Sequence, residues 1–184
     1  MQWKNIQFVF ILFISLTSCK DDQKIAEETT EQTVVSTFYF IRHAEKDRLD
    51  PENIDPELTQ QGLGRAMHWA EILEEVDLDA IFTTDYQRTE MTAAPISVKK
   101  DITVQYYNPQ EINIEQFKAD NLGKNVLIVG HSNTTPELVN LMIGDDKYYE
   151  MDDRDNGSLF IVQFINENAT SQRLHFNCNC PKER

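Results

Sequence analysis

Apolar segments of strand length alternate with helix-like segments from Thr37 onward. Four of the apolar segments are short and rich in β-branched and aromatic residues, which is typical of strands covered by helices on both faces. They are residues 37–43, 80–84, 102–107 and 125–131, and the segments after them predict helices at about 58–76, 86–97, 114–121 and 136–143. Alternating strands and helices predict an α/β domain, a three-layer sandwich with a mostly parallel central sheet flanked by helices.

The first predicted helix and the C-terminal strands carry further local signals. In the longest helical segment, apolar side chains recur at helical spacing and predict the buried face. These are Leu63, Ala66, Met67, Ala70 and Leu73, and Thr59 is positioned as the N-cap. Near the C-terminus, two alternating segments at 158–165 and 172–177 predict a hairpin that closes one edge of the sheet.

Charged and polar side chains follow the predicted strands where they end. Arg42 and His43 end the first strand, and His131 ends the fourth. Ligands of parallel sheets bind outside the carboxyl ends of the strands, so both histidines are expected to face one crevice. Thr135 is predicted to cap the helix that starts at Pro136, and Asp85 to cap the helix that places Arg88 at the same rim. Helix amides at such a rim favour an anion.

Two arginines and two histidines at one rim suit a phosphoryl group. Guanidinium groups match phosphate oxygens two at a time and stay charged at physiological pH. A histidine can attack phosphorus and carry the group covalently, and a second, protonated histidine adds positive charge in the transition state. This chemistry requires no metal and no cofactor. Adjacent guanidinium groups argue against a metal-dependent hydrolase built on the two histidines, because a cation and guanidinium groups repel each other.

Four segments carry a family resemblance. "FIRHAEK", "LTQQGLGRA", "TTDYQRTEMTAAP" and "VLIVGHSNT" resemble, in the same order, motifs of the histidine phosphatase superfamily, also called phosphoglycerate-mutase-like. The resemblance runs from about Thr37 to Gly144. Ala44 replaces the usual glycine after the Arg-His pair, as in the "RHAEK" branch of the family.

The resemblance implies roles for individual residues. His43 would be the phosphorylated nucleophile, and Arg42, Arg88 and His131 would form the phosphate pocket, with Asn133 as a further contact. The general acid is left open among three carboxyls. Glu111, in the loop after the third strand, is the first candidate, Glu45 is the second and Asp85 is the third.

The expected function is a phosphatase acting on a small phosphomonoester, with a phosphoanhydride or a phosphohistidine as alternative substrates. Mutase activity is disfavoured, because no long insertion is present to enclose an intermediate and exclude water. A rival from another class is a catalytically silent module that binds a phosphorylated ligand in the same pocket. The formal net charge of −14, without a basic cluster, excludes nucleic acid as a partner.

The N-terminus predicts export and anchoring. Residues 1–18 have the length and apolar core of a signal peptide, and "LTSC" resembles a bacterial lipobox in which Cys19 is lipidated. Residues 19–36 then form a flexible acidic tether, 37–177 the phosphatase domain and 178–184 a tail. The expected location is the envelope of a Gram-negative bacterium, lipid-anchored in the outer membrane and exposed on its surface, with the lipid as the sole membrane contact.

The tail contains Cys178 and Cys180. A disulfide between residues so close in sequence needs an unusual backbone, and a lone CxC pair does not complete a tetrahedral metal site. The tail is therefore expected to be peripheral to function.

Overall fold

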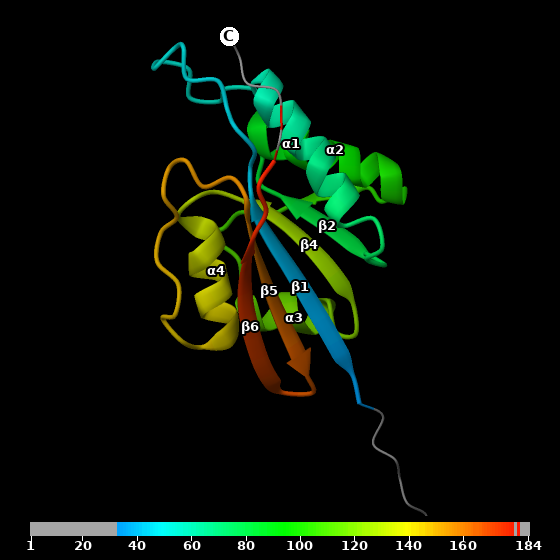
Figure 1. Cartoon of the computed structure of the whole chain (residues 1–184). Coiled ribbons are helices and arrows are strands. Elements are labelled where there is room, and N and C mark those ends of the chain that lie inside the picture. Colours follow the sequence, from blue (N-terminus) through cyan, green and yellow to red (C-terminus); the bar gives the residue numbers. More distant parts are fainter. Residues whose placement is uncertain (1–32, 179, 181–184) are drawn as a thin grey trace, which may run out of the picture. The chain divides into compact units, whose positions relative to one another are not determined.

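The computed structural model describes residues 33–178 and residue 180. Figure 1 shows the elements along the chain. In order they are β1 (Val35–Arg42), α1 (Gln60–Ile72), β2 (Ala80–Thr83), α2 (Gln87–Lys100), β3 (Val104–Tyr106), α3 (Ile114–Asp120), β4 (Asn125–Gly130), α4 (Thr134–Ile143), β5 (Ser158–Ile165) and β6 (Asn168–His175). The predicted alternation of strands and helices is confirmed.

The strands form one sheet in the order β3-β2-β4-β1-β5-β6. The four strands from β3 to β1 run parallel, whereas β5 pairs antiparallel with β1 and with β6. Arg42 of β1 pairs with Gly130 of β4, so these two strands end level with each other. The carboxyl ends of all four parallel strands therefore lie along the same edge of the sheet.

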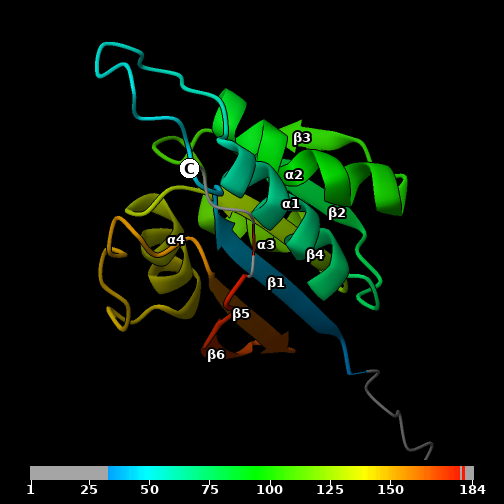
Figure 2. The same cartoon turned by 45° about the horizontal axis from the view of Figure 1, so that its top comes forward.

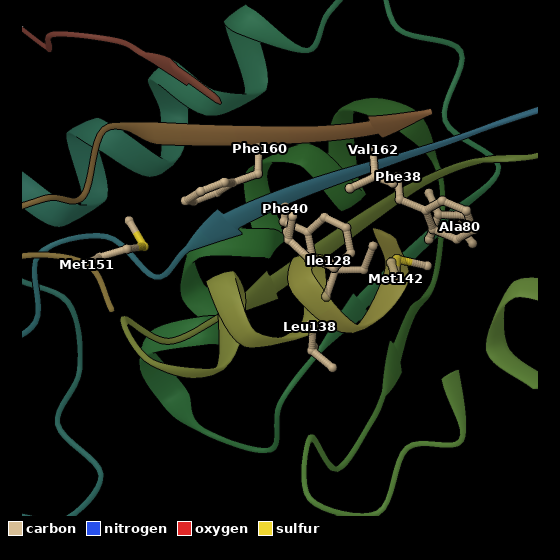
Figure 3. Packing of buried hydrophobic residues seen from close by; sticks show 11 residues of the cluster. Phe38, Phe40, Ala80, Ile128, Leu138, Met142, Met151, Phe160 and Val162 are labelled. Atoms are coloured by element: carbon tan, nitrogen blue, oxygen red, sulfur yellow. The ribbon is translucent and has the colours of Figure 1, made fainter. Parts of the chain in front are cut away.

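Two apolar cores lie on opposite faces of the sheet. Alternate residues of the central strands face α3 and α4 on one side and α1 and α2 on the other, in the layered arrangement visible in Figure 2. Figure 3 shows the first core, in which Phe38, Phe40, Ile128 and Phe160 pack against the side chains of α4. Because both faces are covered, β4 is apolar on both alternating faces after its first residue, Asn125, as predicted. The mixed α/β fold with a central sheet between helices is confirmed.

Several boundaries differ from the predictions. β1 begins at Val35, so residues 35 and 36 belong to the sheet rather than to the tether. β6 begins at Asn168, because the turn is short and Asn166 adopts a left-handed conformation with φ of 54°. The predicted signal peptide, Cys19 and the tether up to residue 32 lie outside the described residues.

The predicted buried face of α1 is wrong in part. Leu63 and Met67 are partly or largely exposed, whereas Arg65 and Trp69 are buried together with Ala66 and Ala70. The inner face is rotated because Arg65 pairs with a carboxylate and Trp69 fills the core, two roles that hydrophobic spacing does not reveal. The predicted N-cap is confirmed, since the hydroxyl of Thr59 accepts a hydrogen bond from the amide of Gly62.

The other two predicted caps are wrong. α4 begins at Thr134 with Asn133 at the N-cap position, so Thr135 lies inside the helix. α2 has Tyr86 at its N-cap position without a side-chain cap bond, so Asp85 does not cap it. Instead, the Thr89 hydroxyl lies 2.8 Å from each of the carbonyl oxygens of Thr84 and Tyr86. The turn is closed from inside the helix, without the side chain of Asp85.

The end of the described chain holds a disulfide between Cys178 and Cys180, whose Cα atoms are 5.1 Å apart. Neither cysteine lines the cavity described below. Among residues 33–178 and 180, no helix has the length and apolar character needed to cross a bilayer.

Candidate active site

A cavity of about 810 Å³ lies at the carboxyl ends of the parallel strands. Its lining comes from the loops after β1, β2, β3 and β4, together with Asp153 from the segment before β5. The lining residues are Arg42, His43, Lys46, Thr84, Asp85, Tyr86, Arg88, Tyr106, Tyr107, Asn108, Pro109, Gln110, His131, Ser132, Asn133, Thr134 and Asp153. The structure thus brings together Arg42, His43, Arg88, His131 and Asn133, residues that lie far apart in the sequence.

His43 is almost completely buried, and its ring has one fixed hydrogen bond. Nδ1 lies 2.7 Å from the carbonyl oxygen of Ala44. A carbonyl oxygen can only accept, so Nδ1 carries the proton and Nε2 of the neutral ring keeps its lone pair. Burial, assisted by the positive charge of Arg42, lowers the pKa of His43 to about 3. The ring is therefore neutral at physiological pH, with Nε2 available as a nucleophile.

His131 lies beside His43, with ring centroids 5.6 Å apart. Its Nε2 is 2.9 Å from the Thr84 hydroxyl, which is 3.0 Å from the Thr89 hydroxyl. The Thr89 proton is directed to backbone carbonyls, so the Thr84 proton goes to Thr89 and His131 Nε2 donates to Thr84. Two threonines thus set the tautomer of this ring. Burial, together with Arg88, lowers the pKa of His131 to about 4.

Arg42 is 2% exposed, and the segment before β5 holds it in place. Its Nη1 donates to the carbonyls of Asp152 and Asp153 at 3.0 and 3.1 Å, and its Nη2 lies 3.1 Å from the Asp153 carboxylate. Among the described residues, its buried Nε has no hydrogen-bond acceptor. A rigid guanidinium that retains an unused donor is suited to an anion.

Arg88 is oriented by two neighbours. Its guanidinium carbon lies 4.2 Å from the centroid of the Tyr86 ring, and its Nη1 is 3.4 Å from a carboxylate oxygen of Asp55. The same tyrosine ring meets His131 edge to face, with centroids 5.2 Å apart. As with Arg42, the Nε of Arg88 is buried without an acceptor in the described part of the chain. Tyr86 therefore positions a cation and a histidine at once.

Comparison with known proteins is consistent with this geometry. The sequence model of the histidine phosphatase superfamily (branch 1) matches residues 38–109. Among solved structures, the α-ribazole phosphatase of Shigella flexneri is similar, with 18% identity, a TM-score of 0.61 and coverage of 80% of this chain and all of that one. A mycobacterial glucosyl-3-phosphoglycerate phosphatase has 14% identity and a TM-score of 0.58, with coverage of 79% and 100%. No curated protein sequence matches the chain.

The protein YhfR of Bacillus stearothermophilus has the same fold, with 17% identity, a TM-score of 0.57 and coverage of 73% and 94% of the two chains. The sequence match and the shared fold support placement of the chain in the histidine phosphatase superfamily. The same two findings, the sequence match and the shared fold, support phosphatase activity in general.

Residues outside the cavity fix the loop that carries His43. The Thr92 hydroxyl accepts from the amide of Ala44 at 2.9 Å, and the Asn156 side-chain amide donates to the carbonyl of His43 at 2.8 Å. A Cβ on Gly62 would lie 2.2 Å from the carbonyl oxygen of Glu45. Glycine at this position lets the first turn of α1 press against the loop.

The two preferred candidates for a general acid do not line the cavity. Glu45 forms an ion pair with Arg65, whose Nη2 and Nε lie 2.7 and 2.8 Å from Oε1, and it also accepts from Gln61. Glu111 lies in the turn after β3, exposed and just beyond the lining residues 107–110. Asp85, the third candidate, does line the cavity.

Sequence reasoning did not single out several residues that line the cavity, among them Lys46, Thr84, Tyr86 and Asp153. The first three lie within the quoted motifs, so their closeness to His43 and to Arg88 in the sequence was an available signal. Asp153 lies in an acidic segment far from any motif, and no local pattern indicates its contact with Arg42. In the described part of the chain, no cluster of three or more His, Cys, Asp or Glu side chains could hold a metal ion.

Proposed function

We propose that the chain is a metal-independent phosphatase that hydrolyses a phosphomonoester through a phosphohistidine intermediate on His43. One observation carries the proposal. The hydrogen bond from Nδ1 of His43 to the carbonyl of Ala44 leaves Nε2 as a free nucleophile inside a cavity that also contains Arg42 and Arg88. Phosphatase chemistry needs this combination of a neutral nucleophile and fixed positive charge.

The reaction has two displacements. Nε2 of His43 attacks phosphorus while the two arginines stabilise the charge on the equatorial oxygens, and the leaving group departs. Water then attacks the phosphohistidine and releases inorganic phosphate. The bound phosphoryl group raises the pKa of His131 because its negative charge favours a protonated ring, so His131 gains positive charge when the substrate enters. Water reaches the open cavity, which favours hydrolysis over transfer to a second acceptor.

The test is hydrolysis of p-nitrophenyl phosphate by the purified full-length chain in the presence of a chelator. Wild type is compared with His43→Ala and with His68→Ala, a matched histidine substitution on the surface of α1. Activity that survives the chelator and the control substitution but disappears in His43→Ala supports the proposal. Trapping acid-labile, base-stable phosphate on the chain would then identify the intermediate. Activity lost to the chelator alone would refute the metal-independent reaction.

The rival function, a silent module that binds a phosphorylated ligand, has one observation in its favour. Neither Glu45 nor Glu111 lies in the cavity, so the carboxylic acid expected of a phosphomonoesterase is missing from both preferred positions. The rival predicts that phosphate raises the melting temperature while no aryl phosphate is turned over. One experiment, which measures both the melting temperature with phosphate and the turnover of an aryl phosphate, therefore distinguishes the two functions.

We also propose that the chain is a lipoprotein of the "RHAEK" branch, anchored through Cys19 in the envelope of a Gram-negative bacterium. The support is the apolar segment before Cys19 and the motif "LTSC". Metabolic labelling with a radioactive fatty acid should label the wild-type chain and not Cys19→Ser. Labelling of both proteins would refute the anchor at this residue.

A further inference from the structure

This inference rests on the proposed phosphatase function and concerns its proton donor. An alcohol leaves phosphorus slowly unless a nearby group protonates its oxygen, and such general acids contribute about 10²- to 10⁴-fold to the rate. Glu45 is held by Arg65, and Glu111 lies outside the cavity. The donor has to be sought among the groups that line the cavity.

Two carboxylates line the cavity, and neither is well placed as a proton donor. Asp153 lies 2.8 Å from Arg48 and 3.1 Å from Arg42, and these hydrogen bonds keep the pKa of its carboxyl below the ordinary value. Asp85 is exposed to solvent, so the protein does not bury its carboxyl group. Burial is what keeps a carboxyl group protonated at neutral pH.

Lys46 differs from these two carboxylates in its charge, its position and its lack of a paired partner among the described residues. It lies three positions after the nucleophile, lines the cavity, and contributes to lowering the pKa of His131. Its backbone is fixed by a β-bridge to Leu58 and by the neighbouring bond from the amide of Asp47 to the carbonyl of Glu57. Within the described residues its ammonium group makes no hydrogen bond or ion pair, so the backbone is anchored while the three ammonium protons are unused.

We propose that Lys46 is the proton donor to the leaving oxygen, and that its neutral amine afterwards activates the attacking water.

The two steps balance. The Nε2 lone pair of His43 forms the N–P bond as the P–O bond to the leaving group breaks. The leaving oxygen takes a proton from the Lys46 ammonium and departs as an alcohol, leaving a neutral amine. A water molecule then attacks phosphorus while the amine takes one of its protons. The N–P bond breaks, its electron pair returns to Nε2, and inorganic phosphate leaves with Lys46 protonated again.

The surroundings of Lys46 suit this cycle. Burial and the charges of Arg88, Arg48 and Arg42 lower the pKa of Lys46, and Asp153 opposes them. A positively charged neighbourhood makes the loss of a proton from an ammonium group easier. In the same neighbourhood a carboxyl group is held ionised, so it has no proton to give. An ammonium group is thus the better acid in this cavity.

The experiment uses the full-length chain and a series of aryl phosphates of similar size, from p-nitrophenyl through phenyl to p-methoxyphenyl phosphate. Lys46→Met removes charge and proton, whereas Lys46→Arg keeps the charge but cannot give up a proton. Asp85→Asn is the matched control at the other unpaired charge. Lys46→Gln is a second neutral variant, and the melting temperature with and without inorganic phosphate shows that each variant has a folded pocket.

We expect Lys46→Met to lose about 100-fold or more in kcat/KM for p-methoxyphenyl phosphate and less than about tenfold for p-nitrophenyl phosphate, whose leaving group needs little help. Lys46→Arg should not restore the loss. An equal loss on all substrates that arginine restores would overturn the role of Lys46, since it would then act only as a charge. A selective loss in Asp85→Asn instead would also overturn it. Absence of turnover by wild type on every substrate would refute the proposed function, and the role of Lys46 with it.

Discussion

Replacing His43 with glutamine is expected to weaken the pH dependence of folding. In the folded protein, burial and Arg42 lower the pKa of His43 to about 3. In the unfolded chain a histidine has a pKa of about 6.5. Between these two values the unfolded state binds one more proton than the folded state, so the free energy of unfolding decreases as the pH falls. Above about pH 6.5 neither state is protonated, and His43 imposes no penalty.

The magnitude follows from the width of this window. Each pH unit inside it costs about 1.4 kcal/mol of stability, so His43 alone removes about 2 kcal/mol between about pH 6.5 and pH 5. The full penalty, reached only near about pH 3, is about 5 kcal/mol. Glutamine has a similar size and no charge, so His43→Gln lacks this dependence, while every other titrating group stays the same.

Urea unfolding of wild type and His43→Gln at about pH 7.5 and about pH 5 measures the difference. The wild type should lose about 2 kcal/mol more than the variant between these conditions. His68→Gln, at a half-buried position of α1, is the control for removing a histidine that does not line the cavity. Equal losses in wild type and His43→Gln would mean that folding does not lower the pKa of His43. The argument that burial keeps this ring neutral would then fail.

Four other substitutions test the geometry of the site. Glu45→Gln should lower the free energy of unfolding by about 2 kcal/mol in urea melts, because Arg65 loses its ion pair, while turnover is retained. Gly62→Ala should cost about 1–3 kcal/mol by the same measurement, since its Cβ would meet the carbonyl of Glu45. Thr84→Val should reduce kcat by about tenfold with little change in melting temperature, and Thr84→Ser should restore it, because only the hydroxyl orients the second histidine. Arg88→Lys should raise KM for aryl phosphates in steady-state assays, since lysine cannot replace the planar donors that stack on the tyrosine ring.

Most of the fold could be predicted because one physical signal dominates it. The strands that are covered on both faces have apolar central segments, residues 38–41 in β1 and 126–129 in β4, and both were recognised on that basis. Where a polar residue enters the core, the same signal fails. Arg65 is buried in α1 because a carboxylate from another loop neutralises it, and this contact displaced the predicted buried face of the helix.

The meeting of the two histidines could be anticipated for a topological reason. Parallel strands end at one edge of a sheet, so residues that follow different strands meet there whatever their separation in sequence. His43 and His131 come together in this way, with rings 5.6 Å apart. The helix caps that were expected to complete the rim were wrong, because their positions depend on the hydrogen bonds of individual turns, and Thr89 closes the turn assigned to Asp85.

The general acid was the least predictable part of the candidate site, and the positive charge of the cavity explains why. A carboxyl group donates a proton at neutral pH only where burial raises its pKa, and such a place has to be free of nearby cations. This cavity contains Arg42, Arg88 and Lys46, and the carboxylates of Asp153 and Glu45 are instead partners for arginines. The positive charge of the cavity therefore disfavours a carboxylic acid beside it. The positive charge of the cavity favours an acid that is itself a cation, such as an ammonium group. Neighbouring positive charges lower the pKa of such a group and so promote the release of its proton.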